Sequence, residues 1–435
     1  MKKENSPWPW WIILTWQLVA VMIIAMRGGT FVQSMCMDDI GVDLVQEWAS
    51  VRNWFTGLPV YEDHAVSLPR HLPKLFGDAT KVRIAIHYNA HPPSSVLIVL
   101  PLGLLSYGQA LLVWNILSLL LIALAIYQIV RELAIQLPAW FWLPGLALLM
   151  LYNPLQQQVN QGQLNGLLLF MLTQAWVADR RGHSRWAGVW LGLATVLKLF
   201  PGALFLYLLM RGCWRGLMAG MFTVLAVTLL TVLVLGMETY YDYVQRVIPT
   251  LNEFRASKLN SSIWGFWIKL LIGSSLEKVT AWVVMPWLAW LFIGIGCGLV
   301  TWAMAWVAWR SQTQEQGDAA FALSLTGMAL LSPITWDHSL LLLTMPLFWL
   351  WKQIRPGEVV NRVSLFIILA IYGYNLNAER ILLERDGIWP VQMGPAFTLG
   401  VLSIYFYTLL AMFLMQLYFC RKLLHGQAGT ERPPA

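Results

Sequence analysis

Charged residues are scarce in this sequence of 435 residues: Asp, Glu, Lys and Arg together make up 12% of it. Ordinary soluble domains contain about 25%. Hydrophobic residues account for 58%, and apolar runs recur from one end of the chain to the other. This composition excludes an ordinary soluble domain and indicates a polytopic membrane protein whose main solvent is the bilayer. The 25 Trp and 14 Tyr are typical of many span ends anchored at membrane interfaces.

Cysteine is also rare, and the motifs of several soluble enzyme classes are missing. The four cysteines, at positions 36, 213, 297 and 420, lie far apart and fit no metal-binding spacing. Only Cys36 falls in a segment expected on the outer, oxidising side of the membrane, so we expect no disulfide. The sequence contains no Walker-type phosphate loop, no His-Glu-x-x-His helix and no G-x-S-x-G elbow. These absences point to a lipid-borne or membrane-permeant reactant.

Basic residues predict how the chain is oriented. Lys2 and Lys3 precede an apolar run from Trp11 to Met26, which we interpret as a retained signal anchor. The inner-positive rule places the short basic links in the cytoplasm. These links are 180–185, 211–215, 352–362 and 421–422. Basic inner loops also account for most of the net charge of +7, so we expect no nucleic-acid partner.

The resulting architecture is an all-α integral membrane bundle with about 11–13 membrane segments, in the plasma or inner membrane. We predict one polytopic domain over residues 1–425 and a cytoplasmic tail over 426–435. The segments with unusual polar content all fall on the extracytoplasmic side. The outer side receives 27–92, 153–163, 237–280, 332–339 and 379–395. Loops 27–92 and 237–280 are the largest of these.

Asp43 opens an amphipathic stretch that ends near Phe55. Leu44, Trp48, Val51 and Phe55 recur at helical spacing, which predicts a helix with one apolar face lying on the bilayer surface. The acid at its head has two interpretations. It is either a helix N-cap, for which Asp is a favoured residue, or an acid held at the lipid–water boundary for chemistry.

Lys198 lies inside an apolar run, and Pro201 follows closely. Charges within membrane segments are costly and usually functional, and Pro201 predicts irregular backbone that lines a cavity. The alternative is a lysine that snorkels to an interface.

Three other polar groups stand near span ends, and each is open to two interpretations. Gln163 and Asn165 either hold sugar hydroxyls or join helices. Asp337 and His338 either orient an imidazole and bind phosphate, or form a helix cap beside an interfacial histidine. Tyr88 and His91 precede two prolines, which predicts an extended lead into the membrane.

The order of these segments resembles glycosyltransferase family 87. The matching segments are Asp43, Gly57 to Tyr61, Tyr88 with His91-Pro92-Pro93, Gly162 to Asn165, Lys198 to Pro201 and Ser332 to His338. This family comprises polyprenyl-phosphate-mannose-dependent mannosyltransferases with the GT-C fold. The resemblance runs from about residue 10 to 420. It implies that an Asp of the first outer loop is the catalytic base, which fits Asp43 best and leaves Asp38 and Asp39 as alternatives.

The hypothesis that follows is a membrane glycosyltransferase with its site on the extracytoplasmic face. Asp43 would accept the proton of an acceptor hydroxyl during an inverting displacement. Lys198 and His338 would hold the donor phosphate. Sugar or acceptor contacts would come from the remaining residues, namely Gln163, Asn165, Tyr88, His91 and Asp337. The donor would be a polyprenyl-phosphate sugar, most simply mannose, and the acceptor a lipid or glycan.

We expect no metal and no cofactor, because the adjacent acids Asp38 and Asp39 supply too few oxygen ligands. Two other functions remain open. A multi-span transporter would use Lys198 and the broken runs as a midplane site for a polar or anionic solute, although no paired repeats are found. A GT-C enzyme with another donor sugar, such as aminoarabinose or arabinofuranose, is the second.

Overall fold

The computed structural model describes residues 9–36, 43–73, 87–275, 278–355, 357–375 and 392–426. Among these residues the regular structure is helical, and β pairing is limited to two isolated bridges, Ser274–Val279 and Val279–Met393. The predicted all-α fold is therefore confirmed. Asp38, Asp39 and most of the predicted tail lie outside the described residues.

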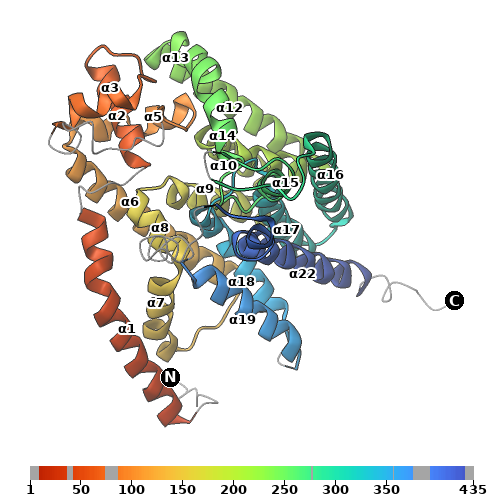
Figure 1. Cartoon of the computed structure of the whole chain (residues 1–435). Helices are drawn as coiled ribbons and strands as arrows, with labels where there is room; N and C mark the ends of the chain where they lie inside the picture. The colour runs from red at the N-terminus through yellow and green to blue at the C-terminus, as the bar shows by residue number, and fades with distance from the viewer. Residues whose placement is uncertain are drawn as a thin grey trace.

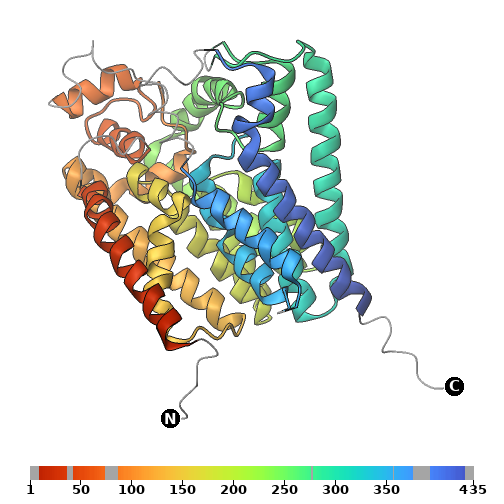
Figure 2. The same ribbon diagram turned by 60° about the horizontal axis from the view of Figure 1, so that its bottom comes forward.

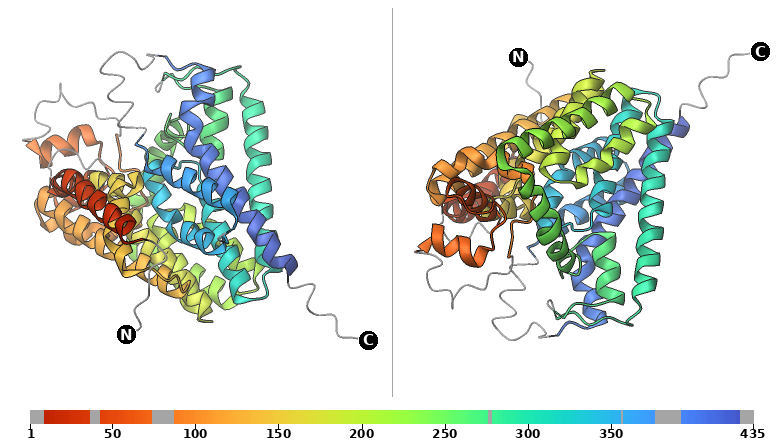
Figure 3. Two further views of the ribbon diagram at one scale, coloured as in Figure 1. Left: turned by 90° about the horizontal axis from the view of Figure 1, so that it is seen from below. Right: turned by 90° about the horizontal axis from the view of Figure 1, so that it is seen from above.

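Five segments are long and apolar enough to cross a membrane. They are α1 (Trp10–Cys36), α6 (Tyr107–Glu132), α12 (Trp214–Leu235), α16 (Pro286–Arg310) and the segment Pro395–His425, which contains most of α22 (Ile404–Gly426). Figure 2 shows the long helices running between two ends of the molecule, with the start of α1 and the end of α22 at the same end. Figure 3 shows α1 and α16 at opposite edges.

Shorter helices form the interior. They are α9 (Asn165–Arg180), α10 (Ser184–Leu197), α17 (Gln314–Leu331) and α18 (Thr344–Gln353), and they cover runs that the sequence marks as apolar but short. Helix α17 is buried along nearly its whole length. The large side chains Trp176, Phe321 and Trp349 are fully buried in this core. The short segments therefore pack against protein, whereas long helices such as α12 expose much of their apolar surface.

The remaining elements connect and cap these helices. They are α2 (Leu44–Phe55), α3 (His64–His71), α5 (Pro93–Val99), η1 (Leu100–Leu104), η2 (Ala139–Phe141), α7 (Trp142–Leu151), α8 (Asn153–Gln161), η3 (Phe200–Leu204), α11 (Phe205–Met210), α13 (Met237–Asp242), η4 (Tyr243–Val247), α14 (Ile248–Phe254), α15 (Ile263–Leu271), η5 (Asp337–Leu343), α19 (Val359–Gly373), α21 (Pro395–Leu399) and η6 (Val401–Ser403). In Figure 1, α2, α3 and α13 gather at one end of the bundle.

Two segments differ from expectation. Helix α1 continues past Arg27 to Cys36, so the helix extends into the segment predicted as the first outer loop. Helix α2 begins at Leu44 as predicted, but it does not lie on the surface, because nine of its side chains are buried, including Gln46, Glu47 and Asn53. Its polar face is covered by polar partners of the protein, a fact that amphipathic spacing alone cannot reveal.

Helices α10 and α12 pack with their backbones in direct contact. A Cβ atom added to Gly188 would lie 1.8 Å from the carbonyl oxygen of Gly216, and one added to Gly192 would lie 2.7 Å from that of Gly220. Such close approach is open only to glycine and is typical of helices packed in membranes. The C-terminal end of α10, which precedes Lys198, is thereby fixed against α12.

The turn between α8 and α9 packs on the start of α2. The backbone N–H of Asp43 donates to the carbonyl of Gln161 at 3.2 Å. Gly162 has a φ of +61°, and a Cβ atom there would lie 2.6 Å from Cβ of Leu44. Glycine is required at this position both for the left-handed backbone and for the close contact.

Replacing Gly162 with alanine is expected to destabilise the protein. The left-handed backbone alone costs a non-glycine residue roughly 1–3 kcal/mol, and the new methyl group must also displace α2. Thermal unfolding of the purified protein in detergent should show a lower Tm. The control is Gly29→Ala, on an open part of α1 with nothing within 4 Å, where Tm should not fall. A parental Tm for Gly162→Ala would show that the turn does not constrain α2.

Candidate active site

Gln163 joins two of the predicted site residues through its side-chain amide. Its Nε2 donates to Oδ2 of Asp43, while its Oε1 accepts from Nζ of Lys198 at 2.9 Å. Lys198 Nζ also donates to Oδ1 of Asn165 at 3.0 Å. All four side chains are at least 92% buried. Three separate parts of the chain therefore form one hydrogen-bonded group, which we call the Asp43–Lys198 cluster.

Asp43 does not cap its helix. Its side chain makes no capping hydrogen bond to the backbone of α2. The carboxylate instead accepts from Nε2 of Gln46 at 2.9 Å and from Gln163. Asp43 lies outside the candidate spans, and burial raises the pKa of its carboxyl above the ordinary value, while the charge of Lys198 acts against this rise. A carboxylate with a raised pKa accepts a proton more readily than an exposed one.

Lys198 directs its amine into the protein. Helix α10 ends at Leu197, Lys198 is extended, and the 3₁₀ helix η3 begins at Phe200, as Pro201 led us to expect. Only 8% of Lys198 is exposed, and its amine is occupied by two side-chain oxygens of the cluster. The lysine therefore does not snorkel to a membrane surface.

The amides of α8 form a chain of hydrogen bonds that leads from Gln163 to Asp337. Gln163 Nε2 is 3.4 Å from Oε1 of Gln161, whose own Nε2 donates to Gln157 at 3.0 Å. Gln157 donates to Asn153, and Asn153 donates to Oδ2 of Asp337, both at 3.2 Å. Because each amide donates to the next, the chain fixes which end of every amide faces which neighbour.

Asp337 and His338 lie within the electrostatic reach of the cluster. Asp337 is influenced by the charge of Asp43, and His338 by the charges of Lys198 and His91. Burial lowers the pKa of His338 well below its ordinary range, so the ring is neutral at neutral pH. Its Nδ1 lies 3.8 Å from Asp337 Oδ1.

Besides Nδ1 of His91, which lies beside Glu47, two buried nitrogens of the site make no hydrogen bond to the described residues. They are Nδ1 of His338 and Nδ2 of Asn165, on side chains that are 4% and 0% exposed. Buried polar atoms are normally hydrogen-bonded, and unsatisfied ones are costly. These atoms are therefore natural places for the oxygens of a bound ligand.

His91 enters the site together with a residue that the sequence analysis did not single out. Its Nδ1 lies 2.7 Å from Oε1 of Glu47, and Glu47 is fully buried. Glu47 follows Asp43 by four residues on α2, a spacing that puts both acids on one side of a helix. That spacing is the signal that could have identified Glu47 from the sequence.

Tyr88 is also predicted as a site residue, but none of its described contacts is with the Asp43–Lys198 cluster. Its ring centroid lies 6.5 Å from that of His87, and the side chain packs on the apolar core. Among the described residues, no group of three or more His, Cys, Asp or Glu side chains is arranged to hold a metal ion.

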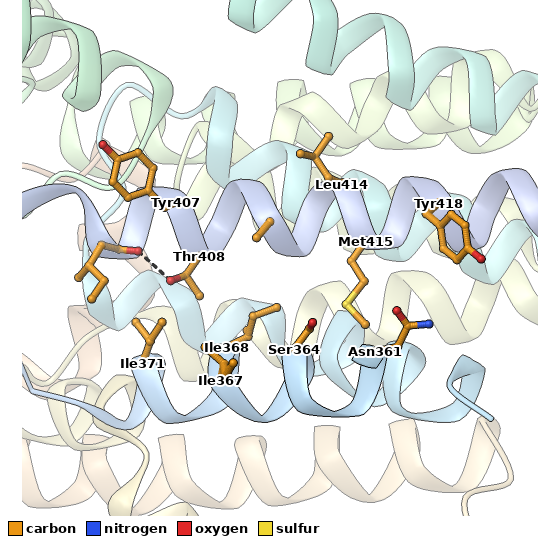
Figure 4. Close-up of a pocket in the computed structure, with 12 residues that line it drawn as sticks. Asn361, Ser364, Ile367, Ile368, Ile371, Tyr407, Thr408, Leu414, Met415 and Tyr418 are labelled. Atoms are coloured by element: carbon orange, nitrogen blue, oxygen red, sulfur yellow. Dashed lines mark hydrogen bonds between the residues drawn. The ribbon is translucent and has the colours of Figure 1, made fainter. Parts of the chain in front are cut away.

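A largely apolar groove lies apart from these polar groups. It has a volume of about 650 Å³ and runs between α19 and α22, where Figure 4 shows Ile368, Met415 and Tyr418 lining it. None of its lining residues belongs to the Asp43–Lys198 cluster. The candidate active site is thus identified by converging charges and hydrogen bonds, and this groove is a separate feature.

Comparisons with known proteins agree on one family of glycosyltransferases. Residues 89–333, more than half of the chain, match glycosyltransferase family 87. A polyprenol-phosphate-mannose-dependent alpha-(1-2)-phosphatidylinositol mannoside mannosyltransferase of Mycolicibacterium smegmatis is 25% identical over 79% of this chain and 74% of its own. The protein of that name in Mycobacterium tuberculosis is 26% identical, over 72% and 68%. An alpha-(1->3)-arabinofuranosyltransferase of Corynebacterium glutamicum is 28% identical, over 60% and 56%. No solved structure matches the chain.

Proposed function

Since the chain belongs to glycosyltransferase family 87, we propose that it transfers mannose from a polyprenyl-phosphate donor to a lipid or glycan acceptor on the extracytoplasmic face of the membrane. The chain is a membrane glycosyltransferase by its family and its apolar helices. Two relatives are named for polyprenol-phosphate-mannose and phosphatidylinositol mannosides, which supports mannose and a glycolipid acceptor. Arabinofuranose is the alternative sugar, because a third relative is named for its transfer.

The observation that carries the proposal is the link that Gln163 makes between Asp43 and Lys198. The side-chain amide of Gln163 holds a proton acceptor, Asp43, at its nitrogen end and a cation, Lys198, at its oxygen end. A sugar-phosphate donor needs both groups, because proton removal and the departure of phosphate occur at opposite sides of the anomeric carbon.

In the proposed reaction, Asp43 takes the proton of an acceptor hydroxyl while that oxygen forms a bond to the anomeric carbon. The bond between the anomeric carbon and the phosphate oxygen breaks, and its electron pair stays on the polyprenyl phosphate. One displacement inverts the anomeric centre. The raised pKa of Asp43 favours this proton acceptance.

Lys198 and its neighbours would receive the departing phosphate. An ammonium group has three N–H donors, and the described hydrogen bonds of Lys198 use two of them. The unpaired nitrogens of Asn165 and His338 add two positions for phosphate oxygens. Because His338 is neutral, it would contribute a hydrogen bond, and Lys198 would contribute the charge.

Asp43→Asn is expected to reduce transfer by about 10²- to 10⁴-fold, because the amide keeps the size of the side chain but cannot accept the proton. The measurement is transfer of labelled mannose from polyprenyl-phosphate-mannose to a membrane lipid extract by purified protein. The matched control is Asp242→Asn, in the second outer loop, where the carboxylate pairs with Arg246 at 3.3 Å; its rate should equal that of the parent. Parental turnover by Asp43→Asn would eliminate Asp43 as the base.

Donor identity is tested in the same assay. If the parent transfers arabinofuranose and leaves mannose untouched, the choice of mannose is wrong, while the roles of Asp43 and Lys198 stand. If it transfers sugar from no polyprenyl phosphate, the proposed function fails.

Lys198→Met should move the acid limb of the kcat/KM profile to higher pH. The positive charge of Lys198 lowers the pKa of Asp43, so its removal raises that pKa further. Because the base acts only when deprotonated, activity then appears at a higher pH. The exposed Lys422, paired with Glu358 at 3.0 Å, supplies the control Lys422→Met, which should leave the profile in place. An acid limb that stays where it is in Lys198→Met would contradict electrostatic coupling of the two residues.

The orientation of the bundle is tested with single cysteines in a background that lacks the native four. Glu253→Cys, on exposed α14, should react with a membrane-impermeant thiol reagent applied to intact cells. Arg181→Cys and Lys352→Cys, in the basic links, should react only after the membrane is opened. Strong labelling of position 181 from outside would reverse the orientation and place the site in the cytoplasm.

A further inference from the structure

We propose that Glu47 is a positioning residue that fixes the His91 ring in one tautomer, so that His91 Nε2 accepts a hydrogen bond from a hydroxyl of the bound sugar. The inference deepens the proposed function and rests on it for the identity of the ligand. Glu47 would act through His91, without touching the reacting atoms.

The Glu47 carboxylate is surrounded by one short segment of chain. Ser95 Oγ lies 3.0 and 3.1 Å from its two oxygens and 2.7 Å from the carbonyl oxygen of Pro92, and its one proton is available to these acceptors. Asn89 Nδ2 donates to Oε2 at 3.1 Å. His91 Nδ1 lies 2.7 Å from Oε1. Glu47 is 0% exposed, so α2 and the 89–95 segment meet around a buried carboxylate.

The contact with Glu47 determines which nitrogen of His91 carries a proton. Oε1 and Nδ1 lie 2.7 Å apart, although the angle of the contact falls outside hydrogen-bond geometry in this structure. Two unprotonated acceptor atoms at this distance would repel each other, so the pair requires a proton, which Nδ1 carries when the carboxylate is ionised. In the neutral ring, the other nitrogen, Nε2, is then an acceptor. Such carboxylate–imidazole pairs fix ring orientation as well as tautomer.

The backbone on either side of the ring is also held. Tyr61 donates its hydroxyl proton to the carbonyl of His91 at 2.6 Å, and the N–H of His91 donates to Oδ1 of Asn89 at 3.0 Å. Pro92 follows and restricts the backbone of His91. The ring therefore has little freedom beyond rotation of its own side chain, which Glu47 removes.

His91 belongs to the same electrostatic environment as the candidate base. His91 lies within electrostatic reach of Asp43 and His338, and 12% of its side chain remains exposed. The other groups assigned to the ligand, Lys198 Nζ and the two unpaired nitrogens, are donors. An accepting nitrogen beside them is the complement that a sugar hydroxyl requires, because the hydroxyl must donate its proton somewhere.

Packing alone does not explain a carboxylate at position 47. A glutamine there has an amide oxygen that would accept from Ser95 and Asn89 without the cost of burying a charge. A carboxylate differs from this amide only in its contact with His91. Because both oxygens of a carboxylate can only accept, they exclude the His91 tautomer that carries its proton on Nε2 and leaves Nδ1 unprotonated. The side-chain amide of glutamine would permit either one.

The tautomer is measured directly by NMR on protein labelled with ¹⁵N at its seven histidines, with His91 assigned through loss of its signals in His91→Phe. The parent and Glu47→Asp should show a proton on Nδ1 of His91. In Glu47→Gln this preference should be lost. The control Glu62→Gln, whose carboxylate instead accepts from the N–H of Asp63, should leave the signals unchanged. A proton on Nε2 in the parent, or an unchanged ring in Glu47→Gln, overturns the proposal.

A double-substitution cycle then tests whether the two residues act as a unit in transfer. Glu47→Gln and His91→Phe should each raise KM for the sugar substrate by about tenfold, the effect of one lost hydrogen bond, with kcat changed by less than about threefold. The double variant should be no worse than the worse single variant, and Glu47→Asp should recover most of the loss.

Other outcomes separate this inference from the proposed function. If the parent transfers sugar and the two effects multiply, Glu47 does not act through His91 and the inference is wrong. If Glu47→Gln lowers Tm and leaves KM unchanged, its role is structural. If the parent transfers no sugar from any polyprenyl phosphate, the proposed function fails and the ligand role of His91 fails with it, while NMR still decides the tautomer.

Discussion

The candidate site depends on one amide that must satisfy two opposite charges at once. Gln163 offers an N–H to Asp43 and an oxygen to Lys198, and all three side chains are buried. Removing a carboxylate and an ammonium group from water is costly unless each finds partners. An amide between them supplies both partners and keeps the two charges from pairing directly with each other. In the proposed function both charges then act on the bound ligand. This arrangement requires a fixed register between α2, the start of α9 and the end of α10.

The scaffold meets that requirement with contacts that tolerate little displacement. Gly162 lets the α8–α9 turn pack on Leu44, next to Asp43. The amide chain along α8 orients the side chain of Gln163 from one direction, and Asp337 terminates it. At the other end of the interior helices, Arg180 of α9 pairs with Asp318 of α17 and lies 3.4 Å from Glu132 of α6. The polar contacts among these satisfy buried or half-buried groups, so the site and the bundle are stabilised together.

Much of this arrangement could be predicted from residue patterns. Apolar runs located the helices, and the proline after Lys198 correctly predicted the end of α10. The sequence predicts Asp43, Gln163, Asn165 and Lys198 as candidate site residues, and hydrogen bonds join their side chains in the structure. Spacing along a helix shows which side chains share a face, but it cannot show what covers that face. The burial of α2 and the pairing of Glu47 with His91 depend on a segment more than forty residues away. The neutral state of His338 likewise follows from burial in three dimensions.

The touching backbones of α10 and α12 make the position of Lys198 depend on packing far along α10. Gly188 precedes Leu197 by nine residues, a rise of about 14 Å along the helix. Since a side chain at position 188 has no space beside Gly216, a larger residue must push the whole helix aside, and Lys198 would travel with its end. Loss-of-function alleles should therefore map to a stripe of glycines remote from any substrate atom.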